Sequence, residues 1–128
     1  MTGRKIMLVE DDKDTMRAMA IRLKSQGYNL VVATDAMSAI STARKEKPDL
    51  IILDLGLPGG DGFVVMQRLR SNMELLMVPI IVVSARDPLQ NKKRALDAGA
   101  AAFLQKPVEN ADFLAAIEKA LSTSIHPV

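Results

Sequence analysis

The chain has 128 residues, a length that fits one domain and allows a sizeable core without disulfides or a structural metal. Its composition, 48% hydrophobic and 25% charged, is typical of a folded globular protein and excludes a disordered or fibrous one. The absence of cysteine excludes disulfides, thiolate metal sites and cysteine nucleophiles, and a net charge of only +2 gives no reason to expect direct nucleic-acid binding.

The first apolar run begins at Ile6 and is interrupted by Glu10, so it is too short for a signal peptide or a membrane-spanning helix. We therefore expect a cytoplasmic protein without membrane insertion. The sequence shows no internal repeat, low-complexity segment or linker. We expect one domain over residues 1–128, with a core of about 5–121 and a frayed tail at 122–128.

Five short apolar runs, rich in β-branched and aliphatic residues, predict five β-strands. These runs cover residues 6–9, 30–33, 50–53, 80–84 and 102–104. Longer stretches with helical periodicity separate them, and this alternation predicts a parallel sheet covered by helices on both faces. The fold class is therefore α/β, as a doubly wound parallel sheet.

Five helices are predicted from apolar residues that recur at helical spacing. The first carries Met16, Met19, Ala20 and Leu23 and ends before Gly27, and the second carries Ala36, Ala39, Ile40 and Ala43. The third carries Phe63, Met66 and Leu69 and follows the segment Gly59-Gly60-Asp61-Gly62. The fourth begins with Asp87 as its cap and Pro88 at its first position. The fifth is predicted to be capped by Asn110 and to carry Phe113, Leu114, Ile117 and Leu121 on one face.

Two further segments have simple structural interpretations. The stretch from Met73 to Met77 is expected to pack beneath the fourth strand, with any exposed part able to adapt to a partner. The basic run Lys92-Lys93-Arg94 in the fourth helix is interpreted as a solvated face.

Polar residues follow four of the predicted strands. The first strand leads into Glu10-Asp11-Asp12, the third into Asp54, the fourth ends in Ser84, and the fifth leads into Gln105-Lys106-Pro107. In a doubly wound sheet the carboxyl ends of the strands share one edge, where ligands bind. Glu10, Asp11 and Asp54 supply three negative charges there and Lys106 one positive charge, which favours a divalent cation with oxygen ligands, Mg²⁺ or Mn²⁺.

These segments resemble the landmark motifs of response-regulator receiver domains. The resemblance covers Ile6 to about Leu121 and includes Leu8-Val9-Glu10-Asp11-Asp12, Pro48 to Pro58 around Asp54, Asp61-Gly62, Ile80 to Ala85, and Phe103-Leu104-Gln105-Lys106-Pro107. It is specific because the motifs keep their order and spacing, with 30 residues from Asp54 to Ser84 and 22 from Ser84 to Lys106.

The resemblance implies a flavodoxin-like fold with strand order 2-1-3-4-5 and a role in two-component signal transduction. It implies that a histidine kinase or phosphotransfer protein donates a phosphoryl group to Asp54 with the help of Mg²⁺. The surface of the fourth helix, fifth strand and fifth helix then changes to control an effector protein or an output domain, with a phosphorylation-dependent dimer as one outcome. Such a domain assists its own phosphorylation and dephosphorylation but is not a turnover enzyme.

The resemblance also implies a role for each site residue. Asp54 is the phosphoacceptor, Asp11 is a direct metal ligand, Glu10 acts on the metal through water, and the backbone carbonyl of Gly56 supplies another ligand. Ser84 and Lys106 bind the phosphoryl group, Phe103 is the aromatic switch residue, and Pro107 follows a cis peptide bond. Gly56 and Arg86 occupy the positions that tune the lifetime of the phosphorylated state, and Asp12 is interpreted as a helix cap.

Three alternatives were weighed against this interpretation. A degenerate receiver that acts only as an interaction module ranks second, because all the chemical residues are present. A phosphatase of the haloacid dehalogenase type needs a second aspartate two residues after the first, where this chain has Gly56. A flavodoxin-like FMN carrier is disfavoured because the acidic segment after the first strand would repel the FMN phosphate.

Overall fold

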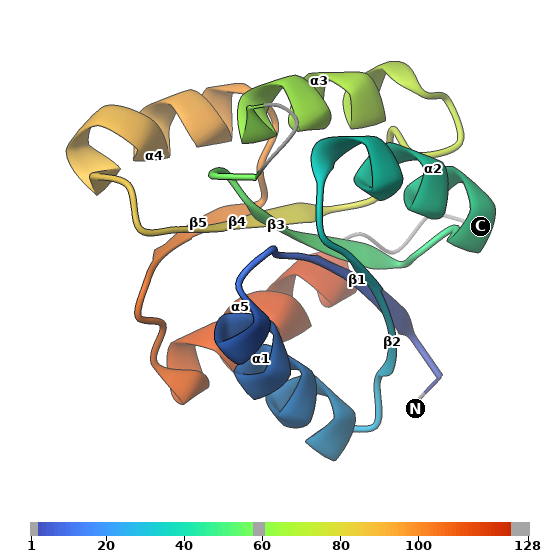
Figure 1. The fold of residues 1–128 in the computed structure, drawn as a ribbon, viewed down its shortest axis with the longest axis vertical. Coiled ribbons are helices and arrows are strands. Elements are labelled where there is room, and N and C mark those ends of the chain that lie inside the picture. The colour runs from blue at the N-terminus through green and yellow to red at the C-terminus, as the bar shows by residue number, and fades with distance from the viewer. Residues whose placement is uncertain (1–2, 58–60, 124–128) are drawn as a thin grey trace.

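The computed structural model describes residues 3–57 and 61–123 (Figure 1). Strands and helices alternate along the chain, as the sequence predicts. They are β1 (Lys5–Val9), α1 (Lys13–Ser25), β2 (Asn29–Ala33), α2 (Ala36–Glu46), β3 (Leu50–Asp54), α3 (Gly62–Ser71), β4 (Ile80–Ser84), α4 (Pro88–Asp97), β5 (Ala102–Gln105) and α5 (Asn110–Thr123).

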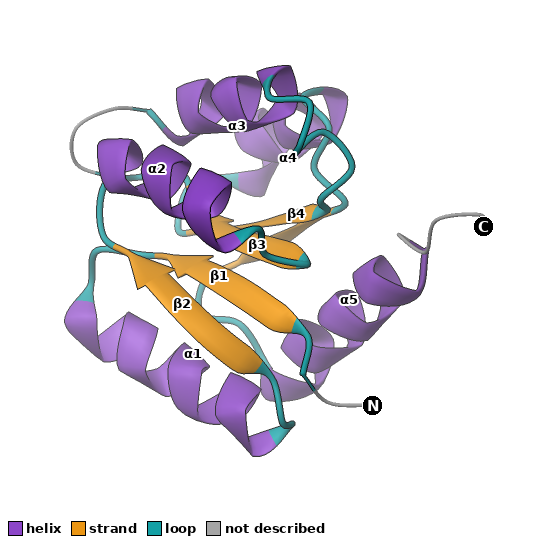
Figure 2. Ribbon diagram, turned by 90° about the vertical axis from the view of Figure 1, so that its right-hand side faces the viewer, coloured by secondary structure: helices purple, strands orange, loops and turns teal. Residues whose placement is uncertain are grey.

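The five strands form one parallel sheet in the order β2-β1-β3-β4-β5. Helices α1 and α5 cover one face, and α2, α3 and α4 cover the other (Figures 1 and 2). The predicted doubly wound fold and its strand order are therefore confirmed. Because the sheet is parallel, the carboxyl ends of all five strands lie at one edge and their amino ends at the opposite edge.

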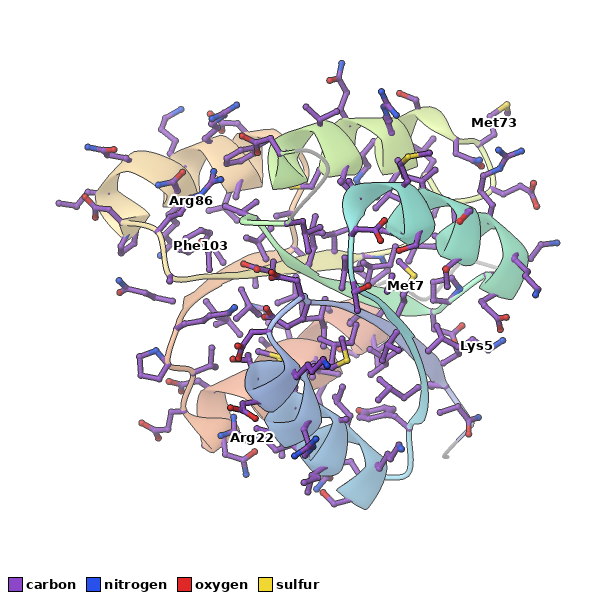
Figure 3. All side chains as sticks on the ribbon, in the orientation of Figure 1. Lys5, Met7, Arg22, Met73, Arg86 and Phe103 are labelled. Carbon is purple, nitrogen blue, oxygen red and sulfur yellow. The ribbon has the colours of Figure 1, made fainter. Side chains whose placement is uncertain are left out.

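The sheet separates two apolar clusters, one on each face. Along β3, Ile51 and Leu53 belong to the cluster beneath α2 and α3, whereas Leu50 and Ile52 belong to the cluster beneath α1 and α5. Met7, on the neighbouring strand, points into the centre of the molecule (Figure 3). A strand that is buried on both faces needs apolar residues at every position, which explains why the runs in the sequence are continuous and not alternating.

The predicted helix caps are mostly confirmed. The carboxylate of Asp12 accepts a hydrogen bond from the Thr15 backbone N–H at 2.8 Å, and Asp87 caps α4 with Pro88 in its first turn. The cap of α5 was predicted one residue too late. Asn110 is already helical, and the carbonyl of Glu109 accepts the first helical bond, so Glu109 holds the cap position.

Two other expectations need correction. Helix α5 continues through Thr123, beyond the expected start of the frayed tail at residue 122, while residues 124–128 lie outside the described part of the chain. Of the stretch from Met73 to Met77, only Leu75 is buried, and Met73 projects outward (Figure 3). The basic run Lys92-Lys93-Arg94 is exposed, as the solvated-face interpretation expects, and the Arg94 guanidinium also stacks over the Phe63 ring at 3.8 Å.

Candidate functional site

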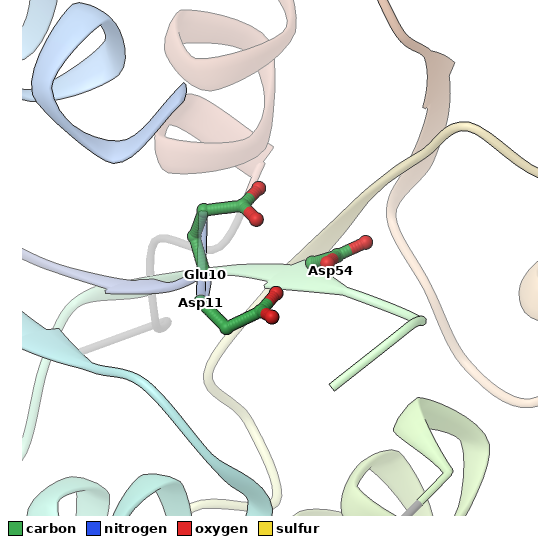
Figure 4. A group of neighbouring side chains, drawn as sticks. All are labelled: Glu10, Asp11 and Asp54. Carbon is green, nitrogen blue, oxygen red and sulfur yellow. The ribbon is translucent and has the colours of Figure 1, made fainter. Parts of the chain in front are cut away.

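Three carboxylates meet at the carboxyl edge of the sheet. Glu10 and Asp11 follow β1, and Asp54 ends β3, which pairs with β1 directly. One carboxylate oxygen from each residue lies within 4.8 Å of the other two (Figure 4). Glu10 and Asp54 are buried, whereas Asp11 is exposed, so the cluster has two fixed members and one that faces solvent. The sequence prediction that these residues converge is confirmed.

Lys106 brings the positive charge to this cluster from the end of β5. Its ammonium donates a hydrogen bond of 2.6 Å to Oε1 of Glu10 and lies 3.7 Å from Oδ1 of Asp54. The Lys106 backbone N–H donates to the Ser84 carbonyl at 2.8 Å, which fixes the start of this loop against β4. The peptide bond between Lys106 and Pro107 is cis, the conformation that the resemblance implied.

The environment of Glu10 raises the pKa of its carboxyl above the ordinary value. Burial raises the pKa of the Glu10 carboxyl, and the negative charge of Asp54 raises it further, while the hydrogen bond from Lys106 partly offsets both effects. The other Glu10 oxygen accepts a bond from the Asp12 backbone N–H at 3.2 Å. A cation placed among these carboxylates would offset the repulsion between Glu10 and Asp54 that contributes to this pKa shift.

The donor set fits a hard divalent cation. Glu10, Asp11 and Asp54 offer oxygen ligands alone, and three carboxylates face a single ammonium group, so the cluster carries excess negative charge. Gly56 lies beside it, because its N–H donates to Oδ1 of Asp54 at 3.3 Å. Gly56 is exposed, and a methyl group built on it would come no closer than 4.0 Å to Oδ2 of Asp54.

Ser84 is buried at the end of β4, the strand next to Asp54. Its hydroxyl oxygen accepts a hydrogen bond of 3.0 Å from the Arg86 backbone N–H. The Arg86 guanidinium points along the β3–α3 connection, where it donates to the Leu55 carbonyl at 3.4 Å and lies 3.9 Å from Asp61. Arg86 therefore contacts the chain on both sides of the connection from β3 to α3.

Gly62 is a site residue that sequence reasoning treated only as part of a motif. A Cβ atom at this position would lie 2.5 Å from the Leu55 Cα and 2.9 Å from the Leu55 carbonyl oxygen. The Gly62 N–H donates to that same carbonyl at 3.0 Å, and Asp61 caps α3 by accepting from the Phe63 N–H. The lack of a side chain thus allows α3 to begin directly against the residue that follows Asp54.

Phe103 is not part of the carboxylate cluster. It is half-buried on β5 and packs against the apolar cluster on the α2, α3 and α4 face. The motif residues Pro58, Gly59 and Gly60 lie outside the described residues. In the part of the chain that the structure describes, no helix is long and apolar enough to span a membrane.

The geometry and the sequence agree with one protein family. The family model for the response regulator receiver domain matches residues 6–118, which is most of the chain. This chain belongs to the response-regulator receiver family. The transcriptional regulatory protein KdpE of Mycobacterium tuberculosis is 37% identical to this receiver domain over 116 residues, which are 91% of this chain and 50% of KdpE. The receiver domain therefore spans about half the length of that curated relative.

Solved receiver structures share the fold. A CheY-like response regulator receiver domain protein from Methanospirillum hungatei superposes with a TM-score of 0.88 at 25% identity, covering 96% of this chain and 97% of that one. The receiver domain of the sensor histidine kinase PA1611 from Pseudomonas aeruginosa superposes with a TM-score of 0.87 at 29% identity, covering 94% and 99%. That structure has a magnesium ion coordinated in its active-site cleft.

Proposed function

We propose that this receiver domain is a phosphorylation switch in which Asp54 accepts a phosphoryl group. The observation that carries the proposal is the convergence of Glu10, Asp11, Asp54 and Lys106 at one edge of the sheet, with carboxylate oxygens within 4.8 Å of one another. An Asp54 oxygen attacks the phosphorus of a donor phosphohistidine, the P–N bond breaks, and an acyl phosphate forms. The donor in this proposal is a histidine kinase or phosphotransfer protein in the cytoplasm.

Mg²⁺ is the proposed cofactor, held by Glu10, Asp11, Asp54 and the backbone carbonyl of Gly56. The magnesium ion in the related PA1611 receiver supports this assignment. When bound, the cation would neutralise negative charge on the transferring phosphoryl oxygens. The exposed position of Asp11 leaves one side of the cluster accessible to an incoming metal and donor.

Lys106 and Ser84 are the proposed phosphoryl-binding groups. The Lys106 ammonium is already 3.7 Å from Oδ1 of Asp54, and a phosphoryl group on that carboxylate would offer it a new acceptor. Ser84 uses its oxygen to accept from the Arg86 N–H, so its hydroxyl hydrogen can donate to a phosphoryl oxygen. Both side chains would then hold the product.

The proposed output is a change in the surface formed by α4, β5 and α5. A bond from Ser84 to the phosphoryl group would shift the end of β4, and the half-buried Phe103 on the adjacent strand is the proposed residue that follows. The effector is a separate protein or an output domain, and a dimer formed on phosphorylation is one form that the output can take. The domain acts as a phosphoacceptor and not as a turnover enzyme.

Intact-protein mass spectrometry after incubation with acetyl phosphate and Mg²⁺ tests the acceptor role. We expect one phosphoryl mass on the wild-type chain, none on Asp54→Ala, and none when EDTA removes the metal. Asp112→Asn, a change at an exposed carboxylate on α5, should behave as the wild type. If the wild-type chain takes no phosphoryl group from acetyl phosphate or from a phosphorylated histidine kinase, the switch proposal is wrong and an unphosphorylated interaction module becomes the better account.

A further inference from the structure

The loop between α3 and β4 presents three apolar side chains to solvent. Met73, Leu76 and Met77 are 89%, 48% and 65% exposed. They are spaced as i, i+3 and i+4 along a turn whose backbone bonds run from Leu75 N–H to the Asn72 carbonyl and from Val78 N–H to the Leu75 carbonyl. Leu75 points inward and is buried, which turns the other three outward. We call Met73, Leu76 and Met77 the apolar tip.

The apolar tip is held in place by a half-buried arginine. The Arg70 guanidinium donates to the carbonyls of Leu76 at 2.6 Å and Val78 at 2.9 Å, and also to the carbonyl of Gly99 at 2.8 Å. These bonds satisfy the loop backbone and connect it to the end of α4. The tip side chains are thus exposed on a loop whose backbone is held by hydrogen bonds. They need no rearrangement to contact a surface.

A cationic cleft of about 410 Å³ borders the apolar tip. Its lining residues come from the carboxyl end of α2 and from the tip loop, and they are Ser41, Arg44, Lys45, Lys47 and Glu74. Lys47 and Glu74 join the two parts through an ion pair of 3.4 Å. Lys47 is thus paired with Glu74, and Arg44 and Lys45 leave the cleft with a net charge of +2, so the cleft is complementary to an anion. The helix dipole explains cations in the last turn of α2, but it does not explain apolar side chains beside them.

The apolar tip and the cleft lie far from the phosphoacceptor. The tip loop leads into the amino end of β4, while Asp54 lies at the carboxyl end of the neighbouring strand β3. Figure 3 shows Met73 at one corner of the molecule, on the side of Lys5, and Arg86 and Phe103 at the other side. A surface bound at the tip would therefore leave the carboxylate edge facing away from it.

We propose that the apolar tip and its cationic cleft form a docking site for an anionic lipid bilayer. The exposed side chains of the tip would enter the interfacial layer, while the cleft would receive the phosphate of a lipid headgroup. Charge complementarity selects an anionic surface, and exposed apolar side chains beside these cations match the acyl and headgroup layers of a bilayer. The contact is peripheral and requires no spanning segment.

Cosedimentation with vesicles tests this proposal. The full chain is mixed with vesicles of phosphatidylcholine alone or of phosphatidylcholine with phosphatidylglycerol, without Mg²⁺ or phosphoryl donor, so the result does not depend on phosphorylation. Three variants are compared with the wild type: a tip variant (Met73→Ser, Leu76→Ser, Met77→Ser), a cleft variant (Arg44→Gln, Lys45→Gln, Lys47→Gln) and a matched control on α4 (Leu89→Ser, Lys92→Gln, Lys93→Gln). Leu89 is 91% exposed, so the control removes similar groups from another surface.

We expect binding only to the vesicles with phosphatidylglycerol. The cleft variant should bind about 100-fold more weakly, from about fivefold per charge, and the tip variant at least about tenfold more weakly. The α4 control should bind as the wild type, and all variants should keep the wild-type Tm. No binding by the wild type, or loss of binding in the α4 control, would overturn the proposal. Loss in the cleft variant alone, with the tip variant intact, would overturn it, because binding would then be electrostatic and would not use the apolar tip.

Discussion

The Lys106 ammonium is bonded to Glu10 at 2.6 Å and is more than 1 Å farther from Asp54, at 3.7 Å. The positive charge of the site is therefore held mainly by a carboxylate other than the proposed acceptor, Asp54. This arrangement leaves Asp54 without a short ion pair to Lys106, so its oxygens stay available for the proposed attack on phosphorus. It also keeps the ammonium close enough to contact a phosphoryl group once one is attached.

Lys106→Gln should slow phosphoryl acceptance strongly. The variant removes the ammonium that stabilises charge on the transferring group, and loss of one such donor costs about 100-fold or more in rate. The rate is measured as the gain of phosphoryl mass with acetyl phosphate and Mg²⁺. Lys92→Gln, at an exposed position of α4, is the control and should keep the wild-type rate. A wild-type rate in Lys106→Gln would remove this residue from the proposed chemistry.

Mg²⁺ should stabilise the folded chain, because folding brings together three carboxylates that are far apart in the unfolded chain. At a metal concentration ten times its Kd, the free energy of unfolding should rise by about 1.4 kcal/mol. Asp11→Asn should lose most of this gain, and because Asp11 is exposed the variant should fold normally without metal. Urea unfolding with and without Mg²⁺ measures the effect. An equal gain in Asp11→Asn would contradict the ligand assignment.

Two glycines near Asp54 should respond differently to the same substitution. In Gly62→Ala the new methyl group meets the Leu55 backbone at 2.5 Å, so the free energy of unfolding should fall by about 1–3 kcal/mol. In Gly56→Ala the nearest atom is Oδ2 of Asp54 at 4.0 Å, and stability should change by less than about 0.5 kcal/mol. Gly56→Ala should instead alter the lifetime of the acyl phosphate. Urea unfolding and a chase of the phosphorylated mass separate the two effects.

A fall in pH should weaken the N-terminal cap of α2, because the Asp35 carboxylate that forms this cap becomes protonated. The hydrogen bond from the Ser38 backbone N–H holds the pKa of the Asp35 carboxyl below its ordinary value of 3.8. The folded state therefore binds this proton less readily than the unfolded state, and the cap stabilises fully above pH 3.8. Its contribution is lost as the pH falls through the lowered pKa.

The variant Asp35→Asn keeps an acceptor oxygen but cannot titrate, so it isolates this effect. The free energy of unfolding of the wild type minus that of the variant should be constant at neutral pH and should decrease below about pH 4. Urea unfolding at several pH values gives this difference. A difference that stays constant down to pH 2 would show that Asp35 does not titrate as the cap geometry requires.

The sequence predicts the sheet well because each strand is a continuous apolar run flanked by polar residues. It also predicts the acidic cluster, since parallel strands bring Glu10, Asp11 and Asp54 to one edge. The start of α5 is less certain from sequence because Glu109 and Asn110 are both polar. Which of them accepts the first helical bond depends on how the chain arrives from Pro107, and this is decided by tertiary contacts.

Side-chain direction is the property that the sequence does not determine. The stretch from Met73 to Met77 has the composition of a buried segment, yet Leu75 alone fills the space beneath it and the methionines turn outward. Similarly, the charge count at the site does not reveal that Lys106 prefers Glu10, or that Arg86 reaches the Leu55 carbonyl. These choices depend on distances of a few tenths of an ångström between segments remote in the chain.

The stacking of Arg94 on Phe63 connects α4 to the start of α3, and this connection bears on the proposed switch. Phe63 follows Gly62, whose backbone rests on Leu55, and Leu55 follows Asp54. A displacement of the end of β3 can therefore be transmitted to α4 through the start of α3. This route does not pass through Ser84 or Phe103. The proposed switch then has two routes to α4, one through Ser84 and Phe103 and one through Phe63 and Arg94. A variant that lost one route would still transmit part of the structural change.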